Sequence, residues 1–195
     1  MNDYSTYNDL ELLPLLREPK PACDNAFFVL YQRYSTKIND YCAFKIGRKD
    51  LAEEIFQETW IRFDKAAKDS KNIFNVPAYL LTIARNLCID HVKEEQKNHK
   101  MLVNIDDISL DRVGNPFDFH NNIGDNELIS IIKVSVNNLE DIYKEAFVLK
   151  KFEELTYKEV AGLCGVSLVC IKQRIKRATA MLKESLKPYI KELSN

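Results

Sequence analysis

Glycine, proline, histidine and tryptophan are scarce in this chain, which has 5 Gly, 6 Pro, 3 His and 1 Trp among 195 residues. So few glycines and prolines favour long helices with few tight turns. The 5 cysteines are odd in number and scattered, with no C-x-x-C pair, so we expect reduced, buried thiols rather than a disulfide framework or a zinc site. The chain also lacks a phosphate-binding loop, a nucleophile elbow and metal-ligand spacing. We therefore expect no enzyme, no metal, no cofactor and no small-molecule substrate.

Long hydrophobic runs are missing as well. No stretch approaches the length of a membrane span, and the first residues, M-N-D-Y-S-T-Y-N-D, have neither the basic region nor the apolar core of a signal peptide. We expect a cytoplasmic protein without membrane insertion. A hydrophobic content of 46% and a charged content of 29% are typical of a globular chain that folds as one domain or two small ones.

The charge is small in total but unevenly distributed. The formal net charge is −1. From Tyr143 onward, basic residues outnumber acidic ones, whereas between Asn104 and Glu127 six acids face Arg112 alone. A basic end preceded by an acidic segment favours selective contact with nucleic acid over general adhesion.

The most informative stretch runs from Leu155 to Ala178 and predicts two helices joined by a tight turn. Thr156 and Glu159 form a capping box at the start of the first helix. Gly165 ends it, because glycine adopts the left-handed conformation without steric cost. Ser167 is an N-cap for the second helix, a contribution of roughly 1 kcal/mol.

The second helix of this pair is amphipathic, with an apolar face and a basic face. Apolar residues recur at helical spacing at Ile171, Ile175, Ala178 and Leu182. The other side carries Lys172, Gln173, Arg174, Lys176 and Arg177. This layout indicates a DNA-binding helix-turn-helix. Periodicity alone also fits an ordinary helical hairpin with a solvated basic face, and it is the joint spacing of caps and glycine that favours DNA binding.

The N-terminal part predicts a leader followed by two amphipathic helices. The leader, residues 1–22, is apolar and broken by prolines, so it is either a short packed helix or a docking arm. A helix opened by Asp24 places Phe27, Tyr31, Tyr34, Ile38 and Tyr41 on one face and ends near Gly47. The next helix is capped by Asp50 with Glu53, and it turns Ala52, Ile55, Phe56, Thr59 and Phe63 inward. Its outer side carries Glu53, Glu54, Gln57, Glu58 and Arg62, which is either a solvated face or an acidic docking surface.

A third helix begins at Asn75 and Pro77 and has two different stripes. The buried stripe comprises Leu80, Ile83, Ala84, Leu87 and His91. The polar stripe comprises Tyr79, Thr82, Asn86, Asp90, Lys93 and Lys97, a combination that suits a strand of unpaired bases through stacking, hydrogen bonding and phosphate neutralisation. Tyr79 at the edge of a core and His91 as a packing residue are the simpler interpretations of those two positions.

The remaining chain supplies a linker and a second helical unit. Residues 98–124 are acidic and show no sustained periodicity. Asp125 caps a helix with Leu128, Ile131, Ile132 and Val136 that breaks at Asn137 and Asn138, and residues 140–152 form a helix with Ile142, Ala146, Phe147 and Leu149 inward. We predict an all-α fold with two small helical domains, 23–97 and 125–188, between the leader, the linker and a tail at 189–195. The C-terminal domain is a four-helix unit that contains the helix-turn-helix and trails off after Pro188.

Together these features resemble a bacterial RNA polymerase sigma factor of the extracytoplasmic-function (ECF) type. The sequences F-x-x-L-Y-x-R-Y at 27–34, D-x-A-E-E-I-x-Q-E-T-W at 50–60 and P-A-Y-L-L-T-I-A-R-N-L-C-I-D at 77–90 resemble the family's second conserved region. The sequences L-x-x-x-Y-K-E-A-F-x-L-K-x-F-E-E-L-T-Y-K-E-V-A at 139–161 and G-V-S-x-x-x-I-K-x-R-I-x-R-A at 165–178 resemble its fourth region. The resemblance covers about residues 24–97 and 125–187, which is nearly all of the foldable chain.

The resemblance implies a specificity subunit that binds core RNA polymerase and promoter DNA. It implies core-polymerase binding by Asp50, Glu53, Glu54, Gln57 and Glu58, which in the family dock on a coiled coil of the large subunit. It implies minus-10 binding by Tyr79, Arg85, Asn86, Asp90 and Lys93, with a base flipped into a pocket of the preceding loop. It implies minus-35 binding by Ser167, Leu168, Val169, Cys170, Lys172, Gln173, Arg174 and Arg177. The acidic linker resembles the segment that threads the polymerase cleft, and an anti-sigma factor is a further partner that the sequence leaves open.

Two departures from the family pattern concern the start of the recognition helix. Leu168 and Val169 replace a polar or small pair, and Cys170 stands where threonine is commoner. An apolar start suits contact with thymine methyl groups. The alternative function is a one-component helix-turn-helix regulator, which would bind a palindrome without polymerase. An adaptor that sequesters a partner through the acidic face is a weaker alternative, since it leaves the basic recognition helix unexplained.

Overall fold

The computed structural model describes residues 4–69, 72–102, 127–151 and 155–192. The chain divides into two compact units, residues 1–118 (unit 1) and 119–195 (unit 2). All regular secondary structure in the described ranges is helical, which confirms the predicted all-α class. None of the described helices is both long enough and apolar enough to cross a bilayer.

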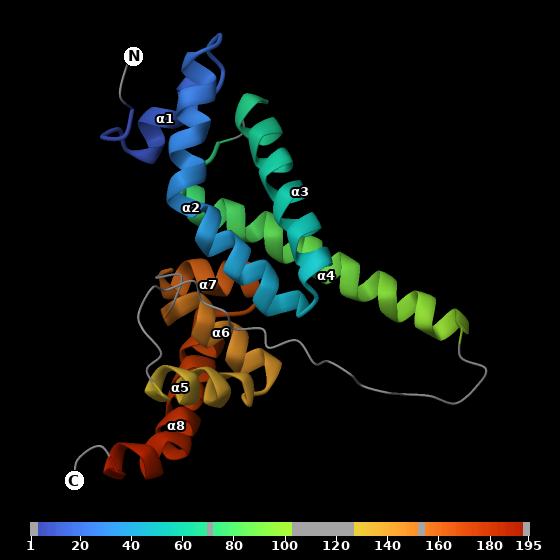
Figure 1. The fold of residues 1–195 in the computed structure, drawn as a ribbon, viewed down its shortest axis with the longest axis vertical. Coiled ribbons are helices and arrows are strands. Elements are labelled where there is room, and N and C mark those ends of the chain that lie inside the picture. Colours follow the sequence, from blue (N-terminus) through green and yellow to red (C-terminus); the bar gives the residue numbers. More distant parts are fainter. Residues whose placement is uncertain (1–3, 70–71, 103–126, 152–154, 193–195) are drawn as a thin grey trace. The chain divides into compact units, whose positions relative to one another are not determined.

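Among the residues of unit 1 that the structure describes there are four helices: α1 (Asp9–Leu15), α2 (Ala22–Ile46), α3 (Lys49–Lys68) and α4 (Val76–Leu102) (Figure 1). Helices α2 and α3 form a hairpin at Gly47, whose left-handed φ of 71° ends α2 as predicted. Helix α4 packs against both of them. The core is formed by side chains from all three helices, including Leu30, Ile38, Tyr41, Ile55, Phe63, Leu80 and Ala84.

The leader is a packed helix, which resolves the alternative that the sequence left open. Helix α1 is capped by Asn8, and it buries Leu12 and Leu13 against α2. Asp9 is held by two residues of α2, because Arg33 Nη1 lies 2.8 Å from one carboxylate oxygen and the Tyr34 hydroxyl donates to the other. Burial and this hydrogen bond raise the pKa of Tyr34 well above its ordinary value. The carboxylate of Asp9 therefore anchors the N-terminal segment on α2.

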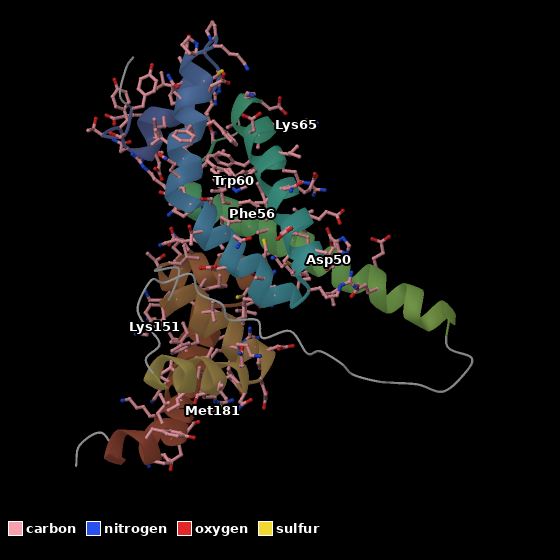
Figure 2. All side chains as sticks on the ribbon, in the orientation of Figure 1. Asp50, Phe56, Trp60, Lys65, Lys151 and Met181 are labelled. Atoms are coloured by element: carbon pink, nitrogen blue, oxygen red, sulfur yellow. The ribbon has the colours of Figure 1, made fainter. Side chains whose placement is uncertain are left out.

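An aromatic cluster fills the space between α2 and α3. Trp60 is 4% exposed, and its ring lies 4.9 Å from that of Tyr31 and 5.6 Å from that of Phe27, measured between centroids. Phe56 and Phe63 extend the cluster along α3, and Figure 2 labels Phe56 and Trp60 on this helix. The inward stripe predicted for the helix at 50–63 is thus confirmed, with Phe56 half-buried.

Two predicted helix starts in unit 1 are wrong. Helix α2 begins at Ala22, before Asp24, so Asp24 lies in its first turn. Helix α3 begins at Lys49 after Arg48, whose side chain makes no cap, so the predicted capping box of Asp50 and Glu53 does not form. Arg48 has an extended backbone and helical geometry begins at Lys49, which places Asp50 inside the first turn. Its carboxylate still interacts favourably with the positive end of the helix dipole there.

The described part of unit 2 contains four helices, as predicted: α5 (Glu127–Asn137), α6 (Asp141–Lys151), α7 (Tyr157–Cys164) and α8 (Leu168–Glu192). Helix α8 packs against the other three. The core includes Val136 and Leu149 together with the predicted α8 residues Ile171, Ile175, Ala178 and Leu182. One predicted inward residue is wrong: Ile142 is 45% exposed, while Glu145 and Val148 are buried on α6 instead.

The helices extend beyond two of the predicted boundaries. Helix α4 continues to Leu102, so the start of the predicted linker is helical; residues 103–124 and Asp125 lie outside the described ranges. Helix α8 continues through Pro188 to Glu192 rather than ending there. The domain borders at the linker stay a prediction.

Candidate functional site

The helix-turn-helix in unit 2 is closed by the local contacts that its sequence predicts. Thr156 Oγ1 accepts a hydrogen bond from the Glu159 amide at 3.3 Å, and a Glu159 carboxylate oxygen accepts one from the Thr156 amide at 2.7 Å. Gly165 has a left-handed φ of 66°. Ser167 Oγ accepts a hydrogen bond from the Cys170 amide at 3.2 Å. These contacts fix the turn between α7 and α8 and hence the direction in which α8 leaves it.

The predicted minus-35 residues are Ser167, directly before α8, and seven residues on the outer side of α8. Six of the eight are exposed, while Cys170 and Arg174 are half-buried. Val169 is 64% exposed although it is apolar, and Leu168 beside it is also exposed. An exposed apolar pair followed by Lys172, Gln173 and Arg177 gives a surface that can contact methyl groups, base edges and phosphates.

A contact that the sequence did not reveal joins α8 to α6. Arg177 Nη1 donates a hydrogen bond to the Tyr143 hydroxyl at 3.2 Å. The hydrogen bond raises the pKa of the Arg177 guanidinium. Because the two residues are 34 positions apart, only the packing of α6 on α8 shows this pair.

The polar stripe of α4 in unit 1 is present along one side of the helix. Asn86, Asp90 and Lys93 are all exposed, and their spacing places them on one face. Tyr79 is half-buried and lies 6.5 Å from the Phe63 ring, between centroids, which agrees with an edge-of-core position. Arg85 is also half-buried. The side chain of Lys97 lies outside the described residues.

The loop before α4, where the resemblance implies a base-binding pocket, borders an apolar groove whose walls on the N-terminal segment and α3 the sequence did not predict. The Asn75 side chain caps α4 by accepting a hydrogen bond from the Ala78 amide at 2.9 Å. Phe74 is 81% exposed, whereas its neighbour Ile73 is buried. Beside them lies a groove of about 320 Å³, with Leu10, Leu13 and Arg17 of the N-terminal segment and Ala67 of α3 on its other walls. Arg17 fixes this wall, since its Nε donates to the Ala67 carbonyl at 2.9 Å.

The acidic face of α3 is formed as predicted, with one apolar addition. Asp50, Glu53, Glu54 and Gln57 are exposed, and Asp50 lies at the start of the helix (Figure 2). Glu58 is half-buried and pairs with Arg62 at 2.6 Å. Ile61 is 63% exposed and lies one turn after Gln57 on the same face. Ile61 lies between Trp60 and Arg62 in the sequence, outside the predicted inward stripe, and an apolar residue at that position was the available signal.

The described residues contain no cluster suited to a metal ion. No group of three or more His, Cys, Asp or Glu side chains among them is arranged to hold one. None of the five cysteines, all of which lie in the described ranges, forms a disulfide; Cys42 and Cys88 are buried, and the other three are half-buried. A hydrogen bond with Cys88, together with burial, raises the pKa of the Cys42 thiol. The prediction that all the thiols are buried thus holds for two of the five.

Comparisons with known proteins place both units in one family. The family model for sigma-70 region 2 matches residues 30–98, and that for sigma-70 region 4 matches residues 131–182. The chain is 30% identical over 156 residues to ECF RNA polymerase sigma factor SigM of Bacillus subtilis, covering 79% of this chain and 91% of that protein. It is 27% identical over 188 residues to SigW of the same organism, covering 88% and 95%.

A solved structure supports the same fold. The sigma factor RpoE from Bartonella quintana, solved in complex with the anti-sigma factor NepR, aligns with a TM-score of 0.60 at 23% identity, covering 80% of this chain and 95% of that chain. Two region models that coincide with the two helical units, and a relative at 30% identity across most of both chains, lead to one conclusion. The chain belongs to the ECF family of RNA polymerase sigma factors, and its function is promoter-directed initiation of transcription.

Proposed function

We propose that this sigma factor uses unit 1 to bind core RNA polymerase and the minus-10 element, and unit 2 to bind the minus-35 element. The proposal rests on one observation: the residues matched by each family model include the surfaces that we predict for its role. The region 2 match covers the acidic face of α3 and the polar stripe of α4, and the region 4 match covers the helix-turn-helix. Each predicted role thus has an exposed face of suitable chemistry.

The polymerase-binding surface is the acidic face of α3: Asp50, Glu53, Glu54, Gln57 and Glu58, with Ile61 added to it. Its carboxylates suit a basic partner surface and would steer the approach of that partner. The exposed isoleucine adds apolar area that becomes buried when the partner docks. An interface core of this kind contributes affinity, while the surrounding charges contribute orientation.

The minus-10 surface combines the α4 stripe with the loop before it. Asn86 offers an exposed amide that can both donate to and accept from a base edge, and Lys93 can neutralise a phosphate. Phe74 offers an exposed ring on which an unpaired base can stack, an interaction worth about 1–3 kcal/mol per base. The groove beside Phe74 has apolar walls and a guanidinium at Arg17, which suits an unstacked base.

The minus-35 surface is the outer side of α8. Leu168 and Val169 suit thymine methyl groups, and Gln173 suits an adenine edge. Lys172 and Arg177 suit backbone phosphates. Arg174 is half-buried, so we expect its guanidinium to contact DNA close to the surface of α8 rather than on the far side of the major groove.

Affinity for promoters arises from linkage rather than from either unit alone. A chain with a net charge of −1 has little general attraction to DNA. Once both units are held on the polymerase, each has a raised effective concentration at its own promoter element. The polymerase supplies the catalysis in the cytoplasm, and the proposal gives this chain no catalytic role. A protein that covered the acidic face of α3 would compete with polymerase, so an anti-sigma factor is a partner that this surface fits.

Charge reversal tests the polymerase-binding surface. Glu54→Lys should weaken binding of the full chain to core polymerase by about tenfold or more, because it places like charges together. Glu18→Lys is the matched control, since Glu18 is an exposed acid of unit 1 outside α3. Anisotropy of the labelled chain titrated with core enzyme measures both. Equal affinities for the two variants would overturn the assignment.

Permanganate footprinting tests the minus-10 surface. Asn86→Ala should lower the reactivity of unpaired thymines in the open complex while leaving initial promoter docking nearly unchanged. Gln32→Ala, which removes an exposed amide from α2, is the matched control. Unchanged open-complex formation by the Asn86→Ala holoenzyme would show that this face of α4 does not hold the melted strand.

A further inference from the structure

We infer that Tyr143 is a positioning residue for DNA binding, and that Tyr143 and Arg177 together form a phosphate-binding pair on unit 2. The inference rests on the proposed function, because it takes the outer side of α8 as the surface that faces the minus-35 element. It adds a residue on α6, a helix outside the helix-turn-helix, to that surface.

The geometry begins with the hydrogen bond between the two side chains. Arg177 Nη1 lies 3.2 Å from Tyr143 Oη, and the contact connects the first turn of α6 to the exposed side of α8. The Tyr143 ring is half-buried, so its hydroxyl has a defined position, whereas Arg177 is exposed. The flexible guanidinium is therefore restrained by the more rigid partner.

The donors that remain on the pair indicate an anion as the ligand. A guanidinium has five N–H donors and no acceptor, and one of its donors is used on Tyr143. The phenol accepts that hydrogen bond and holds the guanidinium in place, so the other N–H donors of Arg177 remain for a ligand. The pair therefore presents several donors and a positive charge to one place, which matches the oxygens of a backbone phosphate.

The position along α8 places the pair beside the base-reading residues. Arg177 follows Gln173 by one helical turn and Arg174 by three residues, so the three share a side of the helix. A phosphate held at Arg177 would fix the depth and register at which Gln173 meets a base edge. Phosphate contacts of this kind orient a recognition helix without reading sequence themselves.

A double-mutant cycle on the holoenzyme tests the inference. The probe is a DNA fragment on which run-off transcription has identified a promoter. It is bound by core polymerase that carries the full-length chain. Tyr143→Phe should weaken binding about two- to tenfold, the effect of one lost hydrogen bond. In the Arg177→Ala background, Tyr143→Phe should weaken promoter binding less than about twofold, because Tyr143 acts only through Arg177 and has nothing left to position. Tyr189→Phe, an exposed tyrosine on α8, is the matched control and should leave binding unchanged.

Salt dependence and a modified backbone identify the ligand. Arg177→Ala should reduce the slope of log K against log salt concentration by about one, uniformly across minus-35 sequences. Tyr143→Phe should leave this slope unchanged. A neutral methylphosphonate at the contacted phosphate should remove the difference between the wild type and Arg177→Ala. A change in base preference at one position on Arg177→Ala would overturn the phosphate assignment.

The outcomes separate this inference from the proposed function. If the wild-type holoenzyme bound native and scrambled minus-35 elements equally, the role of unit 2 would be wrong. If the wild-type holoenzyme discriminated between them, two results would overturn the positioning role. One is that Tyr143→Phe binds the promoter like the wild type. The other is that Tyr143→Phe weakens binding as much in the Arg177→Ala background as in the wild type. Matching melting curves for Tyr143→Phe and Tyr189→Phe exclude a loss of folding as the cause.

Discussion

One substitution, glycine to alanine, should have opposite effects at two positions three residues apart. Gly165 ends α7 with a φ of 66°, whereas Gly162 lies inside α7 without a positive φ. A Cβ placed at either position meets no heavy atom within 4 Å. Steric crowding therefore contributes to neither change, and backbone conformation alone decides the sign.

The magnitudes follow from that difference. Alanine in a left-handed conformation costs about 1–2 kcal/mol. The smaller conformational freedom of alanine in the unfolded chain returns about 0.4–1 kcal/mol, so Gly165→Ala should lose about 1 kcal/mol. At Gly162 alanine is the better helix former by about 0.8–1 kcal/mol, so Gly162→Ala should gain nearly that amount.

Thermal unfolding of the full chain measures both effects with an internal control. For a domain of this size about 1 kcal/mol corresponds to roughly 4–8 °C, so Gly165→Ala should lower the Tm of unit 2 and Gly162→Ala should raise it by similar amounts. Helical circular dichroism reports both units, while fluorescence of the single tryptophan, Trp60, reports unit 1 and should not shift. Shifts of the same sign for the two variants would refute the reasoning about the turn.

Two further predictions concern unit 1. Buried Cys42 and Cys88 should resist a pulse of iodoacetamide until unit 1 unfolds, while half-buried Cys23 should react in the native state. Peptide mass spectrometry measures the labelling of each cysteine. Rapid labelling of Cys42 in the native state would contradict its burial. The pKa of Tyr34 is raised above its ordinary value of 10.0, so the stability that depends on its protonated form is complete below about pH 10 and is lost as the pH rises further. Urea unfolding followed by Trp60 fluorescence should therefore show a steeper alkaline loss of stability for the wild type than for Tyr34→Phe, and parallel losses would count against the buried hydroxyl.

Features set by residues close in sequence could be predicted well. The capping box at Thr156, the left-handed Gly165 and the Ser167 cap all form as expected, because each depends on contacts within a few residues. The buried stripe of α8 was equally predictable from its helical period. The Asp50 cap failed for a local reason too: the turn at Gly47 starts α3 early enough to place this residue inside the helix.

Features set by contacts between distant helices could not be predicted. Helix α1 docks through Asp9 with Arg33 and Tyr34, which lie 24 and 25 residues away. The exposure of Ile142 depends on how the start of α6 meets its neighbours, which periodicity does not specify. The pairing of Tyr143 with Arg177, and the groove between α1 and the loop before α4, arise in the same way.

A mobility-shift experiment with the purified chain, with and without core polymerase, tests the central claim most directly. We predict that the chain alone leaves a promoter fragment unshifted, and that the chain with core enzyme forms a specific complex that depends on both promoter elements. A tight homodimer of the chain that occupied a symmetric operator without polymerase would contradict it.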